Sequence, residues 1–274
     1  MRLLTVRGLD GTMAAKMEGE RVVEVEPRHD DVGSLLAAGP IDAAGSGPAL
    51  DDVEVAPVVT RPGKIICLGL NYRSHIEEMG GEPPSHPTLF AKFASSLVGA
   101  RDPIVLPADS TMVDWEAELA FVIGRRVRGA EHDEALDAIA GYTILNDVSM
   151  RDWQWRTSQW LQGKTWEGST PVGPALVTPD EVDHASDLLL RCEVDGEPMQ
   201  EARTSDLLFR PADIVSYVST ITTLEPGDLI STGTPAGVGA GRQPPVFLQP
   251  GQVVRTTIEG LGEMVNECVR LPVR

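Results

Sequence analysis

The sequence is poor in cysteine, and what little it has is widely spaced. Three cysteines, Cys67, Cys192 and Cys268, occur in 274 residues, and none belongs to a Cys-x-x-Cys pair. An odd number of separated cysteines argues against a disulfide framework and against a zinc–thiolate site. We therefore expect the three cysteines to be small core residues.

Long apolar runs are also missing. No stretch of about 18 apolar residues occurs, so we expect no transmembrane helix and no membrane partner. The apolar stretch near Met1 is too short for a secretory signal peptide, which predicts a cytoplasmic protein.

Basic residues are scarce relative to acidic ones. The chain has 23 Lys and Arg against 41 Asp and Glu, for a formal net charge of −18. Such a surface repels nucleic acids and anionic membranes, so neither is expected as a partner. An anionic substrate would need a local positive patch.

Several sequence motifs of known chemistry are absent or incomplete. The five histidines form no His-x-x-x-His pattern, so any metal site would use oxygen ligands, which favours magnesium, manganese or calcium. The segment 163–165 (Gly-Lys-Thr) ends like a phosphate-binding loop, but Ser158 stands where that loop needs glycine. The glycines of 237–241 are followed by Pro244-Pro245 where a dinucleotide-binding helix should start.

Many short strands with few helices are expected. Turn signals at Asp10-Gly11, Asp195-Gly196 and 260–262 separate apolar runs, whereas an alternating strand–helix pattern is absent. We predict an α+β, β-rich fold of the sandwich or roll type. Proline and glycine in 57–63 predict a boundary between a small β-rich N-terminal domain (1–58) and a larger domain (59–274). Helices are expected over 71–79, 133–139 and 211–222, and 150–160 is expected to be helical or irregular.

The segment Val113–Gly124 is predicted to be one β-strand. Side chains alternate along a strand, which places Asp114, Glu116 and Glu118 on one face, about 6.7 Å apart. Each neighbouring pair repels by roughly 2–3 kcal/mol at an effective dielectric near 20. Either water on a solvated face or a bound divalent cation must offset that repulsion. Asp147, after the strand at 141–145, is either a further oxygen ligand or the N-cap of a helix.

Other polar residues also admit a functional and a structural interpretation. His75 and Glu78, three apart on a predicted helix, form either a general base with its orienting carboxylate or an exposed surface pair. Arg151, Gln154 and Lys164 lie among four tryptophans, and they predict either an anion pocket or tryptophan packing with solvated charged ends. The Gly/Thr-rich loop 232–239, which includes Thr234, either approaches a ligand or is an ordinary tight turn.

Taken in order, these segments resemble the fumarylacetoacetate hydrolase family. The resemblance covers about Pro62 to Val269 and is carried by 70–75 (LNYRSH), 89–92 (LFAK), 114–119 (DWEAEL), 146–154 (NDVSMRDWQ), 163–165 (GKT) and 231–239 (STGTPAGVG). It implies a β-rich roll with a small N-terminal domain, usually assembled as a homodimer.

The resemblance also implies roles for individual residues. It implies a magnesium or manganese ion, with calcium as an alternative, bound by Glu116, Glu118 and Asp147. His75 and Glu78 then match the family's base pair on a lid helix, and Lys164 a group that stabilises developing negative charge. Substrate oxygens are assigned to the residues that match the family's pocket: Arg151, Gln154 and Thr234.

The reaction implied by the resemblance is metal-dependent hydrolysis of a C–C bond in a small 2,4-diketo acid such as an acylpyruvate. His75 would activate the water, and the product would be pyruvate or a related 2-oxo acid. Alternatives on the same scaffold are a decarboxylase of oxaloacetate-like 2-oxo acids and a tautomerase or isomerase of hydroxymuconate-like diacids. A non-catalytic ligand-binding relative is a third alternative. Decarboxylation and isomerisation need no attacking water, so dependence on His75 and Glu78 is expected to discriminate between them and hydrolysis.

Overall fold

The described residues form two large β-sheets and one small two-stranded sheet. The computed structural model describes residues 1–39, 42–43, 47–78 and 80–270. The larger sheet has 11 strands. In spatial order these are β4 (Asp42–Ala43), β3 (Arg21–Glu26), β2 (Gly11–Glu18), β1 (Arg2–Gly8), β13 (Thr170–Val177), β11 (Ile139–Asn146), β10 (Ala117–Ile123), β16 (Leu229–Ser231), β5 (Ile65–Gly69) and β6 (Thr88–Ala91), with β7 (Leu97–Val98) paired to β13.

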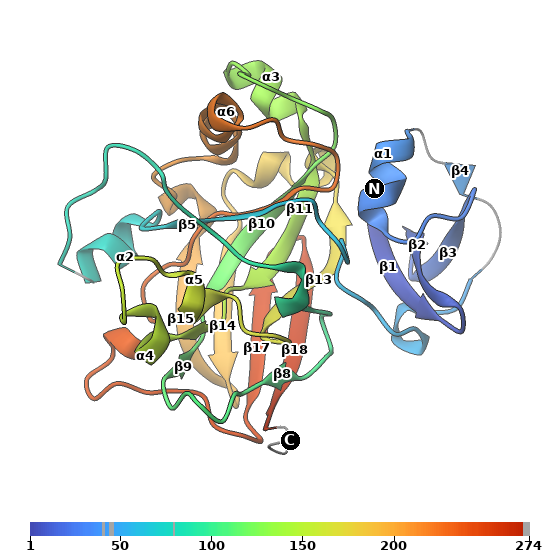
Figure 1. Ribbon diagram of the computed structural model, residues 1–274. Helices are drawn as coiled ribbons and strands as arrows, with labels where there is room; N and C mark the ends of the chain where they lie inside the picture. The colour runs from blue at the N-terminus through green and yellow to red at the C-terminus, as the bar shows by residue number, and fades with distance from the viewer. Residues whose placement is uncertain (40–41, 44–46, 79, 271–274) are drawn as a thin grey trace.

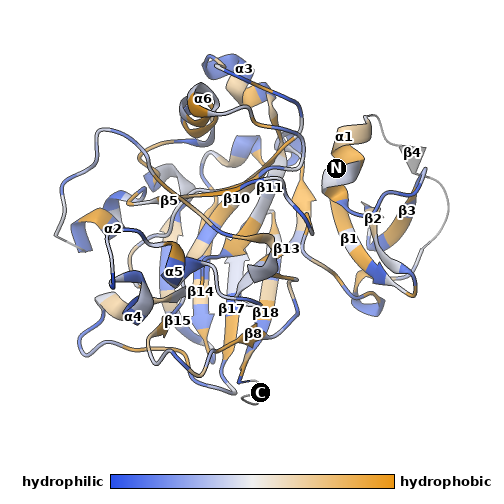
Figure 2. Cartoon of the chain, in the orientation of Figure 1, coloured by the Kyte–Doolittle hydropathy of each residue, from blue (hydrophilic) through white to orange (hydrophobic). Residues whose placement is uncertain are grey.

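The second sheet has five strands and packs against the first. Its order is β15 (Glu197–Arg203), β14 (Leu189–Val194), β17 (Val253–Ile258), β18 (Gly262–Val269) and β8 (Ile104–Val105). Trp115, Phe121 and Tyr142 are fully buried in the main hydrophobic core, which also takes in Leu190, Val254 and Met264 of the second sheet. Figure 2 shows hydrophobic residues concentrated on the strands. The α+β, β-rich fold is confirmed.

The described part of the chain has six short α-helices, which lie outside the sheets (Figure 1). They are α1 (Val32–Ala38), α2 (Arg73–Glu78), α3 (His132–Asp137), α4 (Arg151–Gln154), α5 (Leu161–Lys164) and α6 (Pro211–Ile221). The expected helix over 71–79 is shorter, and Met79 lies outside the described residues. Ile139, expected to end a helix, instead begins β11. In the described part of the chain, no helix has the length and apolarity needed to cross a membrane.

The N-terminal strands continue the large sheet. Figure 1 shows β1, β2 and β3 with α1 as a lobe beside the larger body. Strand β1 joins that body through antiparallel pairing with β13, where Arg2 faces Val177 and Leu3 faces Leu176. The division after residue 58 stays a prediction, and hydrogen bonding between β1 and β13 crosses it.

The single strand predicted over 113–124 is wrong: the chain forms two strands with a break between them. Val113–Asp114 is β9, which pairs with β12 (Ser149–Met150), whereas Ala117–Ile123 is β10 in the large sheet. The break has a physical cause in side-chain hydrogen bonds. The backbone N–H of Glu116 donates to the Asn146 side chain at 3.0 Å, and that of Ala117 donates to the Gln200 side chain at 3.0 Å. Asp114 therefore does not lie on the same strand as Glu118, and its carboxylate contacts Arg151 and the N–H groups of Gly239 and Ala240.

Candidate active site

Strand pairing brings three carboxylates together. Glu116 and Glu118 lie two residues apart, and β10 pairs with β11 so that Ala117 faces Asn146. One residue further along this antiparallel register, Glu116 lies opposite Asp147. The Asp147 N–H donates to the Glu116 carbonyl at 2.8 Å. Side chains opposite each other across a ladder share a face. Each of the three acids places a carboxylate oxygen within 4.8 Å of the others.

The triad of Glu116, Glu118 and Asp147 is buried, which excludes the interpretation of a solvated strand face. Glu118 is 1% exposed and Asp147 is fully buried. Asp147 does not cap a helix either, because Met150 is the N-cap residue of α4 and no side chain caps that helix. A buried acid without a compensating charge is strongly disfavoured, so the partners of the triad decide its chemistry.

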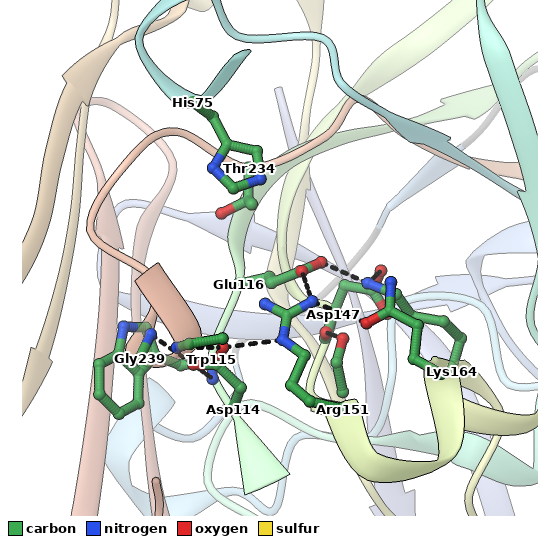
Figure 3. Close-up of polar contacts among 12 residues, drawn as sticks. His75, Asp114, Trp115, Glu116, Asp147, Arg151, Lys164, Thr234 and Gly239 are labelled. Atoms are coloured by element: carbon green, nitrogen blue, oxygen red, sulfur yellow. Dashed lines mark hydrogen bonds and ion pairs between the residues drawn. The ribbon is translucent and has the colours of Figure 1, made fainter. Parts of the chain in front are cut away.

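Three buried cations lie against these acids. Lys164 Nζ donates to Glu116 Oε2 at 2.5 Å and to Asp147 Oδ2 at 2.9 Å. Lys92 Nζ lies 2.6 Å from Asp147 Oδ1, and Arg151 Nη1 lies 2.7 Å from Glu116 Oε1 (Figure 3). The two lysines thus hold the two oxygens of Asp147, while Glu116 is held between Lys164 and Arg151.

Glu118 is the acid of the triad that lacks an ionic partner. It accepts hydrogen bonds from the Ser231 hydroxyl and, at 2.9 Å, from the Gly233 N–H. Burial and then the negative charges of Asp147 and Glu116 raise its pKa well above the usual value. For Glu116, burial also acts to raise the pKa, but Lys164 and Arg151 outweigh it and lower the pKa to about 2.

The donor set fits a divalent cation. All three groups are carboxylates, which hard cations such as Mg²⁺ and Mn²⁺ prefer. Among the described residues Glu118 has hydrogen-bond donors but no cationic partner, and burial together with Asp147 and Glu116 raises its pKa. A divalent cation between Glu116, Glu118 and Asp147 would be such a partner. The identity of the metal stays a prediction.

A small pocket opens onto the triad. Its volume is about 120 Å³. The charged and polar residues that line it are His75, Glu116, Glu118, Arg151, Gln154, Lys164 and Thr234. Apolar and aromatic walls come from Leu68, Leu70, Phe90, Trp155, Trp160 and Val238. Of the nine site residues predicted from the sequence, the structure brings these seven into one pocket, while Asp147 lies directly behind it and Glu78 behind His75.

Arg151 and Lys164 are buried rather than solvated, contrary to the packing alternative. Arg151 Nε donates to Asp114 Oδ2 at 2.8 Å, and its Nη1 donates to Gln154 Oε1 at 2.9 Å. Its Nη2 is buried and has no hydrogen-bond partner. Burial opposes the charged form, but Glu116 and Asp114 outweigh it and raise the pKa of Arg151. Of the guanidinium nitrogens, Nη2 alone keeps its N–H donors unused by the described residues, and a charged N–H group of this kind bonds strongly to a carboxylate.

His75 and Glu78 form a hydrogen-bonded pair that joins helix α2 to the glycine-rich loop. His75 Nδ1 lies 3.0 Å from Glu78 Oε2. Glu78 Oε1 accepts from the Gly237 N–H at 3.0 Å. Their side chains are 12% and 20% exposed, less than a free surface pair would be. His75, Thr234 and Glu116 line the same pocket, and Figure 3 shows the three side chains together.

Thr234 is fixed by the protein itself. Its hydroxyl donates to the Ala117 carbonyl at 3.0 Å and accepts from Gln200 Nε2 at 2.8 Å. The side chain therefore has a set orientation at the pocket wall, next to His75. Its assignment to substrate binding stays a prediction, as do the roles assigned to the other eight residues.

Sequence reasoning gave no role to two residues of this network. Lys92 is buried against Asp147, and Asp114 is buried against Arg151. One feature of the sequence could have pointed to Lys92. It directly follows the mostly apolar segment 88–91, where a buried lysine would need an acidic partner. Asp114 was noticed only as a third acid beside Glu116 and Glu118.

Comparison with known proteins decides the family. The family described as "Fumarylacetoacetate (FAA) hydrolase C-terminal" matches residues 64–269. The chain belongs to the fumarylacetoacetate hydrolase family. The family resemblance recognised from the sequence is therefore confirmed, and with it the general class of enzyme.

Two relatives of known name are similar to this chain over most of its length. The oxaloacetate tautomerase FAHD2A, mitochondrial, of Homo sapiens is 47% identical over 227 residues, which are 81% of this chain and 72% of that protein. The oxaloacetate tautomerase fahd2 of Xenopus laevis is 46% identical over 220 residues, which are 80% of this chain and 69% of that protein. The names of both relatives place them in mitochondria, so the cytoplasmic location stays a prediction for this chain.

Solved structures agree with the fold over the whole chain. A fumarylacetoacetate hydrolase from Exiguobacterium antarcticum is 35% identical, with a TM-score of 0.91 over 99% of this chain and 100% of that chain. A 2-hydroxyhepta-2,4-diene-1,7-dioate isomerase from Mycobacterium marinum is 38% identical, with a TM-score of 0.84 over the full length of both chains. Relatives of this fold therefore carry names for hydrolysis, tautomerisation and isomerisation.

Proposed function

We propose that this protein is a divalent-metal-dependent tautomerase of a small 2-oxo dicarboxylic acid, with oxaloacetate as the simplest member of the class. The observation that carries the proposal is the buried triad of Glu116, Glu118 and Asp147 beside an unpartnered Arg151 Nη2 in one small pocket. The names of relatives at 46% and 47% identity point in the same direction. Tautomerase activity was an alternative at the sequence level, and it now ranks above C–C hydrolysis.

The pocket combines the three groups that tautomerisation needs. A divalent cation held by the triad would supply Lewis-acid polarisation of a 2-oxo carbonyl. Arg151 Nη2 offers an anchor for a substrate carboxylate, because its other nitrogens are held by Asp114, Glu116 and Gln154. Two cationic anchors favour a diacid over a monoacid, and the small volume of the pocket favours a short diacid.

Proton transfer is assigned to His75. Its Nδ1 faces Glu78, so Nε2 is the nitrogen left for the pocket. A neutral imidazole with that tautomer can take a proton from the carbon next to the 2-oxo group and return it to oxygen. Lys164 retains one N–H after its contacts with Glu116 and Asp147 and can donate to an oxygen that gains charge. Gln154 and Thr234 complete the wall against which the substrate oxygens lie.

Hydrolysis of an acylpyruvate is a second candidate, favoured by one observation. The pair of His75 and Glu78 is partly covered by the loop that holds Gly237, and such a pair can activate a water molecule as well as a carbon acid. Tautomerisation as assigned here and hydrolysis both need a base, so, contrary to the expectation from the sequence, loss of activity in a His75 variant does not separate them. Their products do.

The deciding experiment follows products rather than residues. Enol oxaloacetate is mixed with the protein and Mn²⁺, and enol absorbance is recorded alongside pyruvate release. The same assay is run with acetylpyruvate, with cleavage followed by acetate release. Faster loss of enol without pyruvate supports the tautomerase, and a chelator is expected to remove it. Acetate release from acetylpyruvate with no effect on oxaloacetate would replace this proposal with the hydrolase.

Assembly is a separate proposal. The family resemblance implies a homodimer, and light scattering coupled to size exclusion tests it: a mass of twice 29.4 kDa is expected.

A further inference from the structure

Asp114 is a fully buried carboxylate that accepts four hydrogen bonds, three from backbone N–H groups and one from Arg151. Oδ1 accepts from the Trp115 N–H at 2.9 Å and from the Gly239 N–H at 2.7 Å. Oδ2 accepts from the Ala240 N–H at 3.0 Å and from Arg151 Nε at 2.8 Å. Three backbone N–H groups thus hold the carboxylate in place, and Arg151 is its ion-pair partner (Figure 3).

The backbone around Asp114 is shaped for this contact. A Cβ on Gly239 would lie 2.7 Å from Asp114 Oδ1 and 2.0 Å from the Val246 carbonyl, so only glycine lets the loop approach this closely. Amides that are held in place by the loop and by the strand break do not reorganise when a ligand binds. The carboxylate is therefore preorganised before the substrate arrives.

The fixed carboxylate determines how Arg151 is presented. Because Nε is bound to Asp114 and Nη1 to Glu116 and Gln154, the plane of the guanidinium is set from two sides. Nη2 is the nitrogen that remains: it is buried without a hydrogen-bond partner among the described residues, and Arg151 is one of the residues that line the pocket. Without Asp114, Arg151 would keep only its contacts with Glu116 and Gln154, and the guanidinium could turn about Nη1.

We propose that Asp114 is a positioning residue for substrate binding, which acts by aiming Arg151 Nη2 at a carboxylate of the bound diacid. The inference rests on the proposed function, since it assigns Arg151 to that carboxylate. Asp114 does not touch the reacting atoms, and its effect is exerted on affinity for the diacid more than on the chemical step.

The chain offers a matched control in Asp228. Asp228 is 1% exposed, lies 2.7 Å from Lys64 Nζ and accepts from the Glu225 N–H at 2.9 Å. It is a buried, ion-paired aspartate like Asp114, but it does not line the pocket. Removing the charge of Asp228 therefore measures how much the loss of a buried ion pair outside the pocket affects stability and binding.

The experiment compares Asp114→Asn with Asp228→Asn in the full chain with Mn²⁺. Binding of L-malate, a 2-hydroxy diacid that cannot tautomerise, is measured by calorimetry, and KM and kcat are measured with oxaloacetate. Asp114→Asn is expected to weaken malate binding and to raise KM by about tenfold, with a smaller change in kcat. Asp228→Asn is expected to lower Tm and to leave malate binding unchanged. Equal malate binding by wild type and Asp114→Asn would overturn the inference.

A paired variant keeps the test decisive if Asp114→Asn folds poorly. Asp114→Asn combined with Arg151→Gln removes both buried charges, which is tolerated better than leaving one unpaired. The double variant is expected to bind malate with an affinity within about twofold of that of Arg151→Gln alone. If Asp114 acts only through Arg151, its loss has no further effect once Arg151 is gone. A second tenfold loss would mean that Asp114 acts independently of Arg151. If wild type binds no malate, the proposed substrate class itself fails.

Discussion

Glu78 on helix α2 accepts a hydrogen bond from the Gly237 N–H at 3.0 Å, although 159 residues separate the two in the chain. The same carboxylate holds His75 Nδ1 through its other oxygen. One side chain therefore sets the orientation of the base and also fastens α2 over the pocket. The two effects can be separated by substitution.

Glu78→Gln and Glu78→Ala are expected to differ. The glutamine keeps an acceptor for Gly237 but loses the charge that orients His75, so turnover should fall by about 10-fold to 100-fold with α2 still docked. The alanine loses both contacts, and hydrogen exchange of residues 71–78 should rise as well. Glu77→Gln, an exposed neighbour on the same helix, is the control. Wild-type turnover in both Glu78 variants would show that Glu78 does not orient the base.

Metal binding should stabilise the fold through the triad. A ligand at a hundred times its Kd stabilises the native state by about 2.7 kcal/mol, which corresponds to roughly 5 °C or more in Tm for a chain of this size. Mg²⁺ or Mn²⁺ is expected to raise the Tm of wild type, whereas Glu118→Gln should show little or no rise. Glu167→Gln, which removes an exposed acid, should respond like wild type. An equal rise in Glu118→Gln would place the metal elsewhere.

Trp160 is predicted to limit the length of the substrate. It lines the pocket, packs edge-on against Phe90 with ring centroids 5.6 Å apart, and closes so tightly on Gly69 that a Cβ there would lie 2.3 Å away. In Trp160→Ala, the ratio of kcat/KM for a longer 2-oxo diacid to that for oxaloacetate should rise about tenfold.

Trp153 supplies the control for that change. It packs edge-on against Trp166, with centroids 5.1 Å apart, and does not line the pocket. Trp153→Ala should lower stability without altering the preference for chain length. If both tryptophan variants shift the preference equally, the effect comes from loosening of the segment rather than from the pocket wall.

Asp31 gives a prediction for stability against pH. It caps α1 by accepting from the Ser34 N–H at 2.8 Å, and it also accepts from the Thr60 N–H at 2.8 Å. Burial acts to raise the pKa of Asp31, but the hydrogen bonds from Ser34 and Thr60 outweigh it, so its pKa lies below the ordinary 3.8. The ionised group therefore stabilises the fold fully above that value, and the contribution is lost as pH falls through the lower folded pKa.

Asp31→Asn is accordingly expected to lower the free energy of unfolding by about 1 kcal/mol at neutral pH. The difference from wild type should shrink below about pH 4, where the aspartate gains a proton and resembles the asparagine. Urea melts at pH 7 and at pH 3 measure it. A difference of the same size at both pH values would contradict the assignment.

Local pattern was enough to place two of the three acids. Alternation along a strand puts Glu116 and Glu118 on one face whatever their partners are. Asp147 is different, because its place beside Glu116 depends on the register of β10 against β11, a pairing that no single segment encodes. Its position after the strand at 141–145 left it either a ligand or a helix cap, and the family resemblance favoured the ligand.

The errors have local causes as well. The break between β9 and β10 depends on side chains of Asn146 and Gln200, which are distant in sequence. Helix α1 was not predicted, since residues 31–50 are rich in alanine, glycine and aspartate. A signal was nevertheless present there, because Asp31 and Ser34 form a capping box at the start of α1.

The pairing of β1 with β13 has a practical consequence for dissecting this molecule. A chain trimmed to residues 59–274 would leave one flank of β13 without its neighbour, since Arg2 and Leu3 would no longer cover Val177 and Leu176. Bare strand flanks recruit other chains and cause aggregation. Shortened forms of the protein should therefore keep the first strand, or replace its hydrogen bonds, if they are to stay dispersed.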